Sequence, residues 1–295
     1  MASVVERVTA ARARLEAAGL AHDDAALDAE ILARHALGWD RASFLADRRD
    51  PEPRGFEMTF DALVSRRARR EPVSQIVGVR EFWGLDFEVS SDVLTPRPET
   101  EIIVEEAIEF ARDHPCRHII DVGTGSGCLA VAIARELPAV RVTAVDASAA
   151  ALTIAQRNAA RHAVAERITF LSGDLLEGSS GLADLIVSNP PYIPDAEALV
   201  LQPEVVQYEP RAALFGGPTG LEVIRRLFEQ AVAHLADQGR LIVEFGFGQA
   251  GSIARLAEDT GWQVVRLRED LQGVPRTLVA RPVPPRQRPE GDENG

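Results

Sequence analysis

A strand-like apolar run ends in a short segment rich in functional groups, Asn189-Pro190-Pro191-Tyr192. Two successive prolines prevent a helix and any further ladder hydrogen bonds, so we expect a stiff loop after the strand. Asn189 offers an amide oxygen and an NH₂ group, Pro190 a backbone carbonyl, and Tyr192 a flat aromatic face. These groups suit a planar amide or amino group. A segment of only four residues can equally be a simple turn that ends the strand. The neighbouring motifs must therefore show whether it binds a ligand.

A glycine-rich segment between an expected strand and an expected helix could hold a second ligand. Glycines permit a tight turn and close approach of a ligand, and a helix N-terminus exposes N–H groups. The spacing is Gly-X-Gly-X-Gly, whereas dinucleotide enzymes have Gly-X-Gly-X-X-Gly. We therefore expect a nucleoside ligand without pyrophosphate. The candidate residues of this segment are Asp121, Gly123, Thr124, Gly125, Ser126 and Gly127.

Two further acidic residues follow expected strands. Asp146 ends the next strand along the chain, where an acidic side chain commonly binds ribose hydroxyls. Asp174 follows the third strand and could accept from an adenine amine, with Leu175 against the ring. Each aspartate alone could be an ordinary loop or cap residue. Because the three acids fall at the ends of successive strands, together with Asn189 they indicate one ligand-binding rim.

Alternating strand and helix patterns in the second half must position these residues. The alternation predicts an α/β fold, a mostly parallel, Rossmann-like seven-stranded sheet with helices on both faces. Ligands on such sheets bind beyond the carboxyl ends of the strands. The expected strands are 117–122, 141–145, 168–171, 184–188, 240–245, 263–267 and 277–280, and the expected helices are 128–137, 148–162, 221–236 and 250–259.

The first part of the chain has helical spacing from Val4 to about Arg70, with a basic run formed by Arg66, Arg67, Arg69 and Arg70. A solvated helix face explains this run better than contact with an acidic partner. Pro72 should end the helices, and a β-hairpin connector should follow. We expect a helical docking domain over 1–72, the connector over 73–95, the α/β domain over 96–282 and a disordered tail over 283–295.

Composition excludes several classes of protein. Hydrophobic residues make up 46% and charged residues 26% of the chain, as in globular proteins, and no apolar run is long enough to span a membrane. The start lacks a signal-peptide layout, so we expect a cytoplasmic protein. A net charge of −13 argues against direct nucleic-acid binding. Cys116 and Cys128 suit free, buried thiols, and no metal site is expected.

The Gly-X-Gly-X-Gly segment, Asp146, Asp174 and Asn-Pro-Pro-Tyr, in this order, resemble a class I S-adenosylmethionine-dependent methyltransferase. More specifically, the region from Pro72 to Arg281 resembles the peptide chain release factor N5-glutamine methyltransferases, the PrmC/HemK family. The segments that carry this likeness are Pro72-Val73-Ser74-Gln75-Ile76-Val77-Gly78, Glu81-Phe82-Trp83-Gly84, Thr95-Pro96-Arg97-Pro98-Glu99-Thr100-Glu101, Tyr208-Glu209-Pro210-Arg211-Ala212-Ala213-Leu214-Phe215-Gly216-Gly217 and Gly220-Leu221. Two segments, 246–249 and 273–276, differ from the family's usual forms, and we expect both to lie away from the chemistry.

The resemblance implies methyl transfer from S-adenosylmethionine to the glutamine side-chain nitrogen in the Gly-Gly-Gln motif of class I release factors, with S-adenosylhomocysteine as the second product. It implies that the Asn189 side-chain oxygen and the Pro190 carbonyl accept the two amide protons and that Tyr192 packs on the amide plane. Pro191, Arg97 and Glu99 would complete the substrate site, and Asn189 would also contact the cofactor.

Three alternatives remain open. The first is an amino-group methyltransferase of DNA or ribosomal RNA, the second is a ribosomal-protein glutamine methyltransferase, and the third is a non-catalytic S-adenosylmethionine-binding protein. The acidic charge argues against the first. The intact Asn189-Pro190-Pro191-Tyr192 segment argues against the third, because nucleotide binding alone would not require it.

Overall fold

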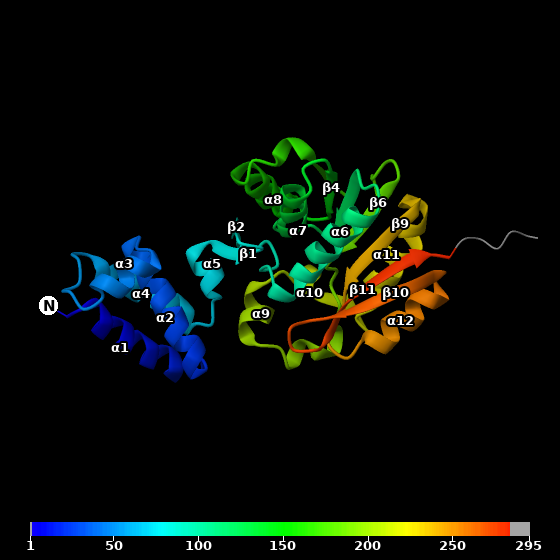
Figure 1. The fold of residues 1–295 in the computed structure, drawn as a ribbon. Helices are drawn as coiled ribbons and strands as arrows, with labels where there is room; N and C mark the ends of the chain where they lie inside the picture. Colours follow the sequence, from blue (N-terminus) through cyan, green and yellow to red (C-terminus); the bar gives the residue numbers. More distant parts are fainter. Residues whose placement is uncertain (1, 284–295) are drawn as a thin grey trace, which may run out of the picture. The chain divides into compact units, whose positions relative to one another are not determined.

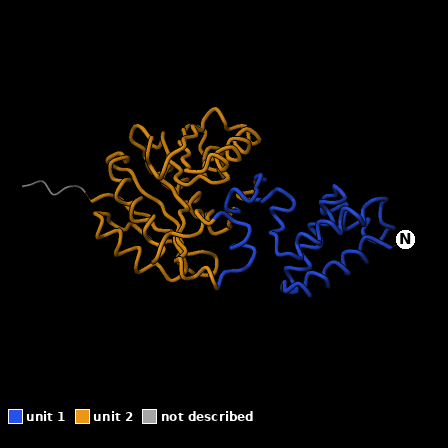
Figure 2. Tube along the Cα trace, turned by 180° about the vertical axis from the view of Figure 1, so that it is seen from behind, with its two compact units in different colours: residues 1–81, 86–95, 200–210 blue, residues 82–85, 96–199, 211–295 orange. Residues whose placement is uncertain are grey.

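The chain divides into two compact units in the computed structural model, which describes residues 2–283 (Figures 1 and 2). The first unit contains the chain up to Glu81 together with Asp86–Thr95 and Val200–Pro210, and the second contains Phe82–Leu85, Pro96–Leu199 and the chain from Arg211 onward. The expected domain limits stay a prediction. Residues 284–295 of the expected disordered tail lie outside the described residues.

Four helices build the core of the first unit: α1 (Val4–Ala17), α2 (His22–Leu37), α3 (Arg41–Asp47) and α4 (Phe56–Ala68). Ser3 and Glu6 form a reciprocal capping box that begins α1, and Gly38 ends α2 in the left-handed conformation. Leu15, Leu32 and Phe44 are almost completely buried between the helices. The helical pattern over 4–70 is therefore confirmed, whereas the short α3 was not expected.

The basic run at the end of α4 is not a solvated face, and this expectation was wrong. Arg67 is only 7% exposed, and its Nε donates to Asp28 Oδ2 at 2.6 Å. Its Nη1 donates to Glu204 Oε1 at 3.0 Å, and Arg70 Nη2 donates to Glu204 Oε2 at 2.8 Å. Glu204 belongs to α9 (Pro203–Tyr208), more than 130 residues away in the sequence. Among the four arginines, Arg69 is the exposed one.

The helix α4 already ends at Ala68, and a short helix, α5 (Val73–Val77), begins directly after Pro72, so the expectation that this proline ends the helices was wrong. Proline favours the start of a helix because it needs no N–H partner there. The expected hairpin follows as a two-stranded sheet of β1 (Val79–Phe82) and β2 (Leu85–Glu88). Residues 82–85, which contain the turn between these strands, belong to the second unit.

A seven-stranded sheet in the order β10-β11-β9-β6-β3-β4-β5 forms the second unit. The strands are β3 (His118–Val122), β4 (Arg141–Asp146), β5 (Ile168–Ser172), β6 (Ala183–Ser188), β9 (Leu235–Glu244), β10 (Trp262–Glu269) and β11 (Pro275–Pro282). The neighbours from β9 to β5 run parallel, and β11 pairs antiparallel with both β9 and β10. All seven expected strands are confirmed, with the predicted mostly parallel arrangement.

Helices cover both faces of this sheet (Figure 1). The helices α11 (Glu222–Ala231) and α12 (Ala250–Asp259) share one buried cluster with side chains of alternate strand positions, such as Ile120, Ile186 and Val243. The intervening positions, including Ile119 and Val187, are also fully buried. On that side, α6 (Glu101–Asp113) and α7 (Cys128–Glu136) contact the central strands and each other, and α8 (Ala149–Arg161) contacts β4 and β5.

One local expectation needs correction in the second unit. The helix expected over 221–236 ends earlier, since α11 stops at Ala231 and is followed by a 3₁₀ turn, Val232–His234. Leu235 already pairs with Ala183 of β6, so sheet pairing overrides the helical pattern there. The remaining short elements are β7 (Ile193–Pro194), β8 (Phe215–Gly217), α10 (Arg211–Leu214) and the 3₁₀ turns 98–100, 165–167 and 195–199.

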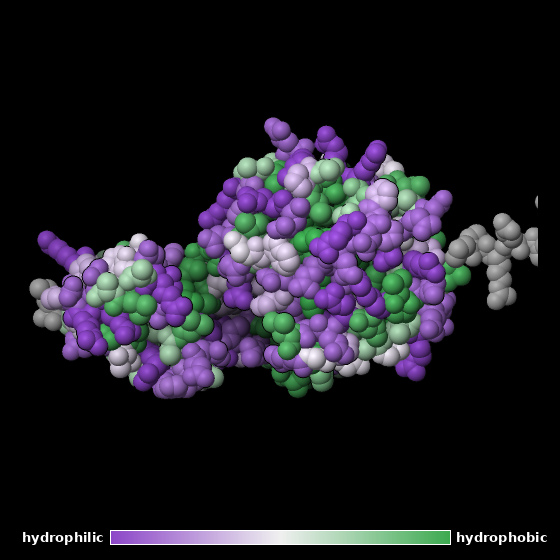
Figure 3. All heavy atoms as spheres, viewed as in Figure 1, coloured by the Kyte–Doolittle hydropathy of each residue, from purple (hydrophilic) through white to green (hydrophobic). Residues whose placement is uncertain are grey.

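On the face shown in Figure 3, hydrophobic residues lie in small clusters among hydrophilic ones. None of the helices within residues 2–283 combines the length and the apolar character needed to cross a membrane. Cys116 and Cys128 are free thiols, as expected, but both are only partly buried.

Candidate active site

The Asn189-Pro190-Pro191-Tyr192 segment leaves the carboxyl end of β6, in the middle of the sheet. The last residue of the strand, Ser188, is fully buried, and its Oγ donates to Val122 O of β3 at 2.7 Å. Pro190 is buried, and Asn189 and Tyr192 are partly buried. The segment thus begins at the edge where β3 and β6 end side by side.

Asn189 is held by side chains from two distant parts of the second unit. Its Nδ2 donates to Thr100 Oγ1 at 3.0 Å, and the Thr100 hydroxyl donates to Glu244 Oε2 at 2.6 Å. The Tyr192 hydroxyl donates to the other oxygen, Glu244 Oε1, at 3.2 Å. Thr100 ends the 3₁₀ turn before α6, and Glu244 is the last residue of β9. A chain of hydrogen bonds therefore ties the loop to these two elements.

One polar atom of this cluster remains without a partner. Asn189 Oδ1 is buried and accepts no hydrogen bond from any group in residues 2–283. A buried acceptor without a partner is costly, by about 1–3 kcal/mol, and is therefore uncommon in folded proteins. Such an atom is suited to receive a proton-bearing group of a ligand.

Burial raises the pKa of two groups in this cluster, the Glu244 carboxyl and the Tyr192 phenol. It raises the pKa of the Glu244 carboxyl to about 7, although hydrogen bonds from Thr100 and Tyr192 act in the opposite direction. Burial and then the nearby Glu244 raise the pKa of the Tyr192 phenol above its ordinary value. Tyr192 is consequently neutral at physiological pH and donates its proton.

The glycine-rich segment lies after β3, next to this cluster in the sheet. Gly123, Gly125 and Gly127 all have positive φ angles, of 72°, 56° and 79°, which side chains other than glycine rarely adopt. A Cβ on Gly127 would lie 3.0 Å from Ala155 Cβ, so the segment packs tightly on α8. Gly125 N donates to Asp146 Oδ2 at 2.8 Å. The loop and Asp146 are thus in direct contact, and their role as one ligand site stays a prediction.

Asp121 is fully buried at the start of this segment. Its Oδ2 accepts from Thr124 Oγ1 at 2.6 Å and from Ala130 N at 3.2 Å, whereas Oδ1 is buried without a partner among the described residues. Burial raises the pKa of Asp121 to about 7. Ser126 Oγ is a second buried atom without a described partner. A ligand carrying a positive amino group would satisfy Asp121, so these residues fit S-adenosylmethionine.

The other acidic candidates differ in environment. Asp146 accepts from Gly125 N and from Ser148 N, each at 2.8 Å, through different oxygens. Asp174 is exposed, and Arg226 of α11 binds its Oδ2. Leu175 packs against the buried cluster beneath α11 and has a positive φ of 57°. All stand at the ends of adjacent strands, but their roles as ligand contacts stay a prediction.

Arg97 and Glu99 lie just before the start of α6 and are partly buried. The positive charge of Arg97 lowers the pKa of Tyr192, and the negative charge of Glu99 raises that of Glu244. Both therefore lie within electrostatic range of the Asn189 cluster. Their expected contact with a substrate stays a prediction.

Thr100, Glu244 and Gln249 belong to the site but were not among the expected residues. Gln249 Nε2 donates to Tyr192 O at 2.9 Å, and Gly246 N donates to Gln249 Oε1 at 2.8 Å. The expectation that 246–249 lies away from the chemistry was therefore wrong. It was also wrong for 273–276, because the charge of Arg276 lowers the pKa of both Tyr192 and Glu244. Glu244 could have been found by the rule that identified Asp146, since it too is an acid at the end of a strand.

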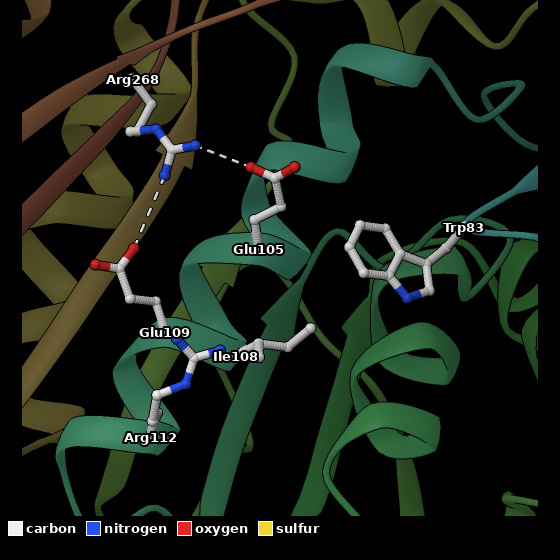
Figure 4. A pocket seen from close by; sticks show the side chains of 6 residues that line it. All are labelled: Trp83, Glu105, Ile108, Glu109, Arg112 and Arg268. Atoms are coloured by element: carbon white, nitrogen blue, oxygen red, sulfur yellow. Dashed lines mark hydrogen bonds and ion pairs between the residues drawn. The ribbon is translucent and has the colours of Figure 1, made fainter.

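A different pocket of about 290 Å³ lies beside α6 (Figure 4). It is lined by Trp83, Glu105, Ile108, Glu109, Arg112 and Arg268. Arg268 Nη2 donates to Glu105 Oε2 at 2.9 Å, so charges of this pocket neutralise one another. None of the expected site residues lines it, and we assign no ligand to it.

Two solved structures share the fold at low sequence identity. A methyltransferase from Pyrococcus furiosus superposes with a TM-score of 0.51 at 20% identity and covers 73% of this chain and 97% of its own. The hMettl16 catalytic domain gives a TM-score of 0.57 at 17% identity, over 72% of this chain and 80% of its own. These likenesses support the α/β methyltransferase fold alone.

Sequence comparison identifies the family. The PrmC N-terminal domain matches residues 6–78, and the methyltransferase small domain matches residues 101–207. A release factor glutamine methyltransferase from Geobacter sulfurreducens is 44% identical over 260 residues, which cover 88% of this chain and 90% of that protein. Another from Nitratidesulfovibrio vulgaris is 43% identical over 275 residues, 92% of either chain. The chain therefore belongs to the family of release factor glutamine methyltransferases.

Proposed function

We propose that this enzyme methylates, in the cytoplasm, the side-chain amide nitrogen of the glutamine in the Gly-Gly-Gln motif of class I peptide chain release factors. The observation that carries the proposal is the buried Asn189 Oδ1, which accepts no hydrogen bond from the described residues. A glutamine amide bears two protons and needs acceptors in fixed positions. Asn189 Oδ1 and the adjacent Pro190 carbonyl would supply them.

The reaction requires orientation more than strong base catalysis. An amide nitrogen is a weak nucleophile, because its lone pair is delocalised into the carbonyl group. Acceptors for both N–H groups would hold the nitrogen in the orientation for attack, and the Tyr192 ring would cover the amide plane. When bound, S-adenosylmethionine would supply a methyl group on a positively charged sulfur and would leave as S-adenosylhomocysteine. As the amide nitrogen gains the methyl group it would lose one proton to solvent, so the other product would be N5-methylglutamine.

The glycine-rich segment would hold the cofactor. We assign the amino group of S-adenosylmethionine to the free oxygen of Asp121, because that oxygen is buried without a described partner. Asp146 would accept from the ribose hydroxyls with its remaining lone pairs, and Asp174 with Leu175 would contact the adenine. Arg97 and Glu99 would line the substrate side.

The test combines methyl-labelled S-adenosylmethionine with four separate acceptors: a purified class I release factor, ribosomal proteins, ribosomal RNA and DNA. We expect label on the release factor, and its loss when the Gly-Gly-Gln glutamine is replaced by alanine. Asn189→Ala should lower kcat by about 10²–10³-fold, the size found when one charge-stabilising contact is removed, and should keep cofactor affinity. Label on RNA, DNA or ribosomal proteins alone would refute the proposal.

A further inference from the structure

The side chain of Asn189 can adopt two orientations that differ in chemistry. In the structure its NH₂ group faces Thr100 Oγ1 at 3.0 Å, so its oxygen is the group without a partner among residues 2–283. A rotation of the amide by 180° would exchange the two groups and present NH₂ to the ligand. An NH₂ group cannot accept a proton from a glutamine amide, so only the observed orientation serves the proposed reaction.

Thr100 favours the observed orientation of Asn189 only if the proton of its own hydroxyl points away from Asn189. A hydroxyl has one proton and two lone pairs. Glu244 Oε2 lies 2.6 Å away and takes that proton when it is a carboxylate, which leaves Thr100 Oγ1 as an acceptor for the NH₂ group. If Glu244 carries a proton and donates it to Thr100, the Thr100 proton can turn to Asn189 and favour the opposite orientation.

We propose that Thr100 and ionised Glu244 are positioning residues that orient the Asn189 amide, so that its oxygen faces the substrate nitrogen. Both are deeply buried, with 2% and 1% exposure, so water does not compete for these hydrogen bonds. Neither residue needs to touch the substrate. The inference rests on the role proposed for Asn189 and deepens it.

The inference also predicts a pH dependence. The groups that face Glu244 are Thr100, the Tyr192 hydroxyl and the charged Glu99 and Arg276, and the neutral Cys128 thiol lies close enough to sense its charge. Burial and Glu99 raise the pKa of Glu244, and Arg276 lowers it, with a balance of about 7. Because the carboxylate is the active form, kcat should fall below pH 7 as Glu244 gains its proton.

The matched substitutions are Thr100→Val, Thr100→Ser and Thr277→Val. Valine has the shape of threonine without the hydroxyl, and serine restores the hydroxyl. Thr277 is fully buried in β11, and its hydroxyl has no partner in the described chain. Thr277→Val therefore measures the effect of replacing a buried threonine by valine when no hydrogen bond is lost. We expect Thr100→Val to lower kcat about 100-fold with nearly unchanged KM, and Thr100→Ser to recover most of the loss. Thr277→Val should match the wild type.

An equal fall of kcat in Thr100→Val and Thr277→Val would overturn the inference. A Thr100→Val variant with a raised KM and an unchanged kcat would also overturn it. Glu244→Gln cannot ionise, so the decline of kcat below pH 7 should disappear in this variant. A decline that persists unchanged in Glu244→Gln would also count against the assignment.

A second measurement does not depend on methyl transfer. The chain has three asparagines, Asn158, Asn189 and Asn294, so protein labelled with [¹⁵N]asparagine gives three side-chain amide signals. We expect the Asn189 signal to shift and exchange faster with solvent in Thr100→Val, but not in Thr277→Val. An unmoved signal refutes the orienting role. If the signal shifts but the wild-type enzyme does not methylate release factors, the proposed function fails and the orienting role stands.

Discussion

Removal of Arg67 should destabilise the first unit strongly, because this guanidinium neutralises buried acids. The Arg67 and Asp28 side chains are 9% and 10% exposed and lie 2.6 Å apart. Loss of one partner of a buried pair typically costs about 3–5 kcal/mol. Glu204 would keep Arg70 at 2.8 Å, so we expect a value of about 3 kcal/mol for Arg67→Ala, near the lower limit. For a unit of roughly 100 residues this lowers Tm by about 12–24 °C.

Hydrogen exchange followed by mass spectrometry localises this effect. A loss of about 3 kcal/mol speeds exchange roughly 150-fold in segments that open with the first unit. We expect faster exchange in α2, α4 and α9, all parts of the first unit. The core strands β3 and β6 of the second unit should exchange as in the wild type. An effect below about 1 kcal/mol, or equal acceleration in both units, would contradict the reasoning.

Two further variants separate charge from packing. Arg12→Ala removes an exposed helical pair with Glu16, with side chains 41% and 35% exposed, and should cost about 0.3–0.5 kcal/mol at most. Asp28→Asn introduced into Arg67→Ala should recover part of the loss, because it removes the buried uncompensated charge. No recovery would indicate that lost packing, not charge, explains the effect.

The pH dependence gives an independent check of the same pair. Burial raises the pKa of Asp28 above its ordinary value, in spite of Arg67. Without Arg67 this pKa rises further. A carboxyl whose folded pKa exceeds its unfolded pKa stabilises the fold at low pH, and this contribution is lost as pH rises through the folded value. The deficit of Arg67→Ala should therefore shrink as the pH falls.

Three other outcomes follow from the geometry of the second unit. Gly216→Ala should lower kcat and stability, because a Cβ at this position would lie 2.5 Å from Pro191 O. Gly251→Ala in α12 should be neutral or stabilising by about 0.4–1 kcal/mol, because no described atom lies within 4 Å of the added Cβ. Activity assays and thermal unfolding of the two variants check these outcomes. Burial raises the pKa of Cys128 to about 12, so thiol reagents should modify it slowly at pH 8, and rapid labelling would contradict this. Glu106→Gln weakens the hydrogen bonds that Arg266 and Arg268 donate to this side chain, which is 1% exposed, and urea unfolding should show a loss of about 2 kcal/mol.

The sequence alone determined the local structure of this protein well. Sequence patterns located all seven strands of the sheet, and the glycines, the two prolines and the strand-end acids marked the carboxyl ends of the strands as the place of the candidate site. These signals are readable because each depends on a few consecutive residues: a strand buried on both faces is a short apolar run, a helix repeats every three to four residues, and a proline such as Pro190 cannot donate a ladder hydrogen bond. The helix expected over 221–236 ended early because sheet pairing from Leu235 overrode its pattern.

Only the tertiary structure decided which distant side chains meet. Glu244, Thr100 and Asn189 come together because β9, β6 and β3 are neighbours in the sheet and α6 contacts β9 and β6, an order that the sequence does not reveal. Likewise, Glu204 of α9 forms a buried ion pair with Arg67, which belongs to a basic run that the sequence pattern assigned to the solvent. Asn-Pro-Pro-Tyr names the groups that can bind an amide. Which group of Asn189 stays free depends on a hydroxyl 89 residues away, because a hydrogen bond joins atoms that are close in space, whatever their separation in the chain.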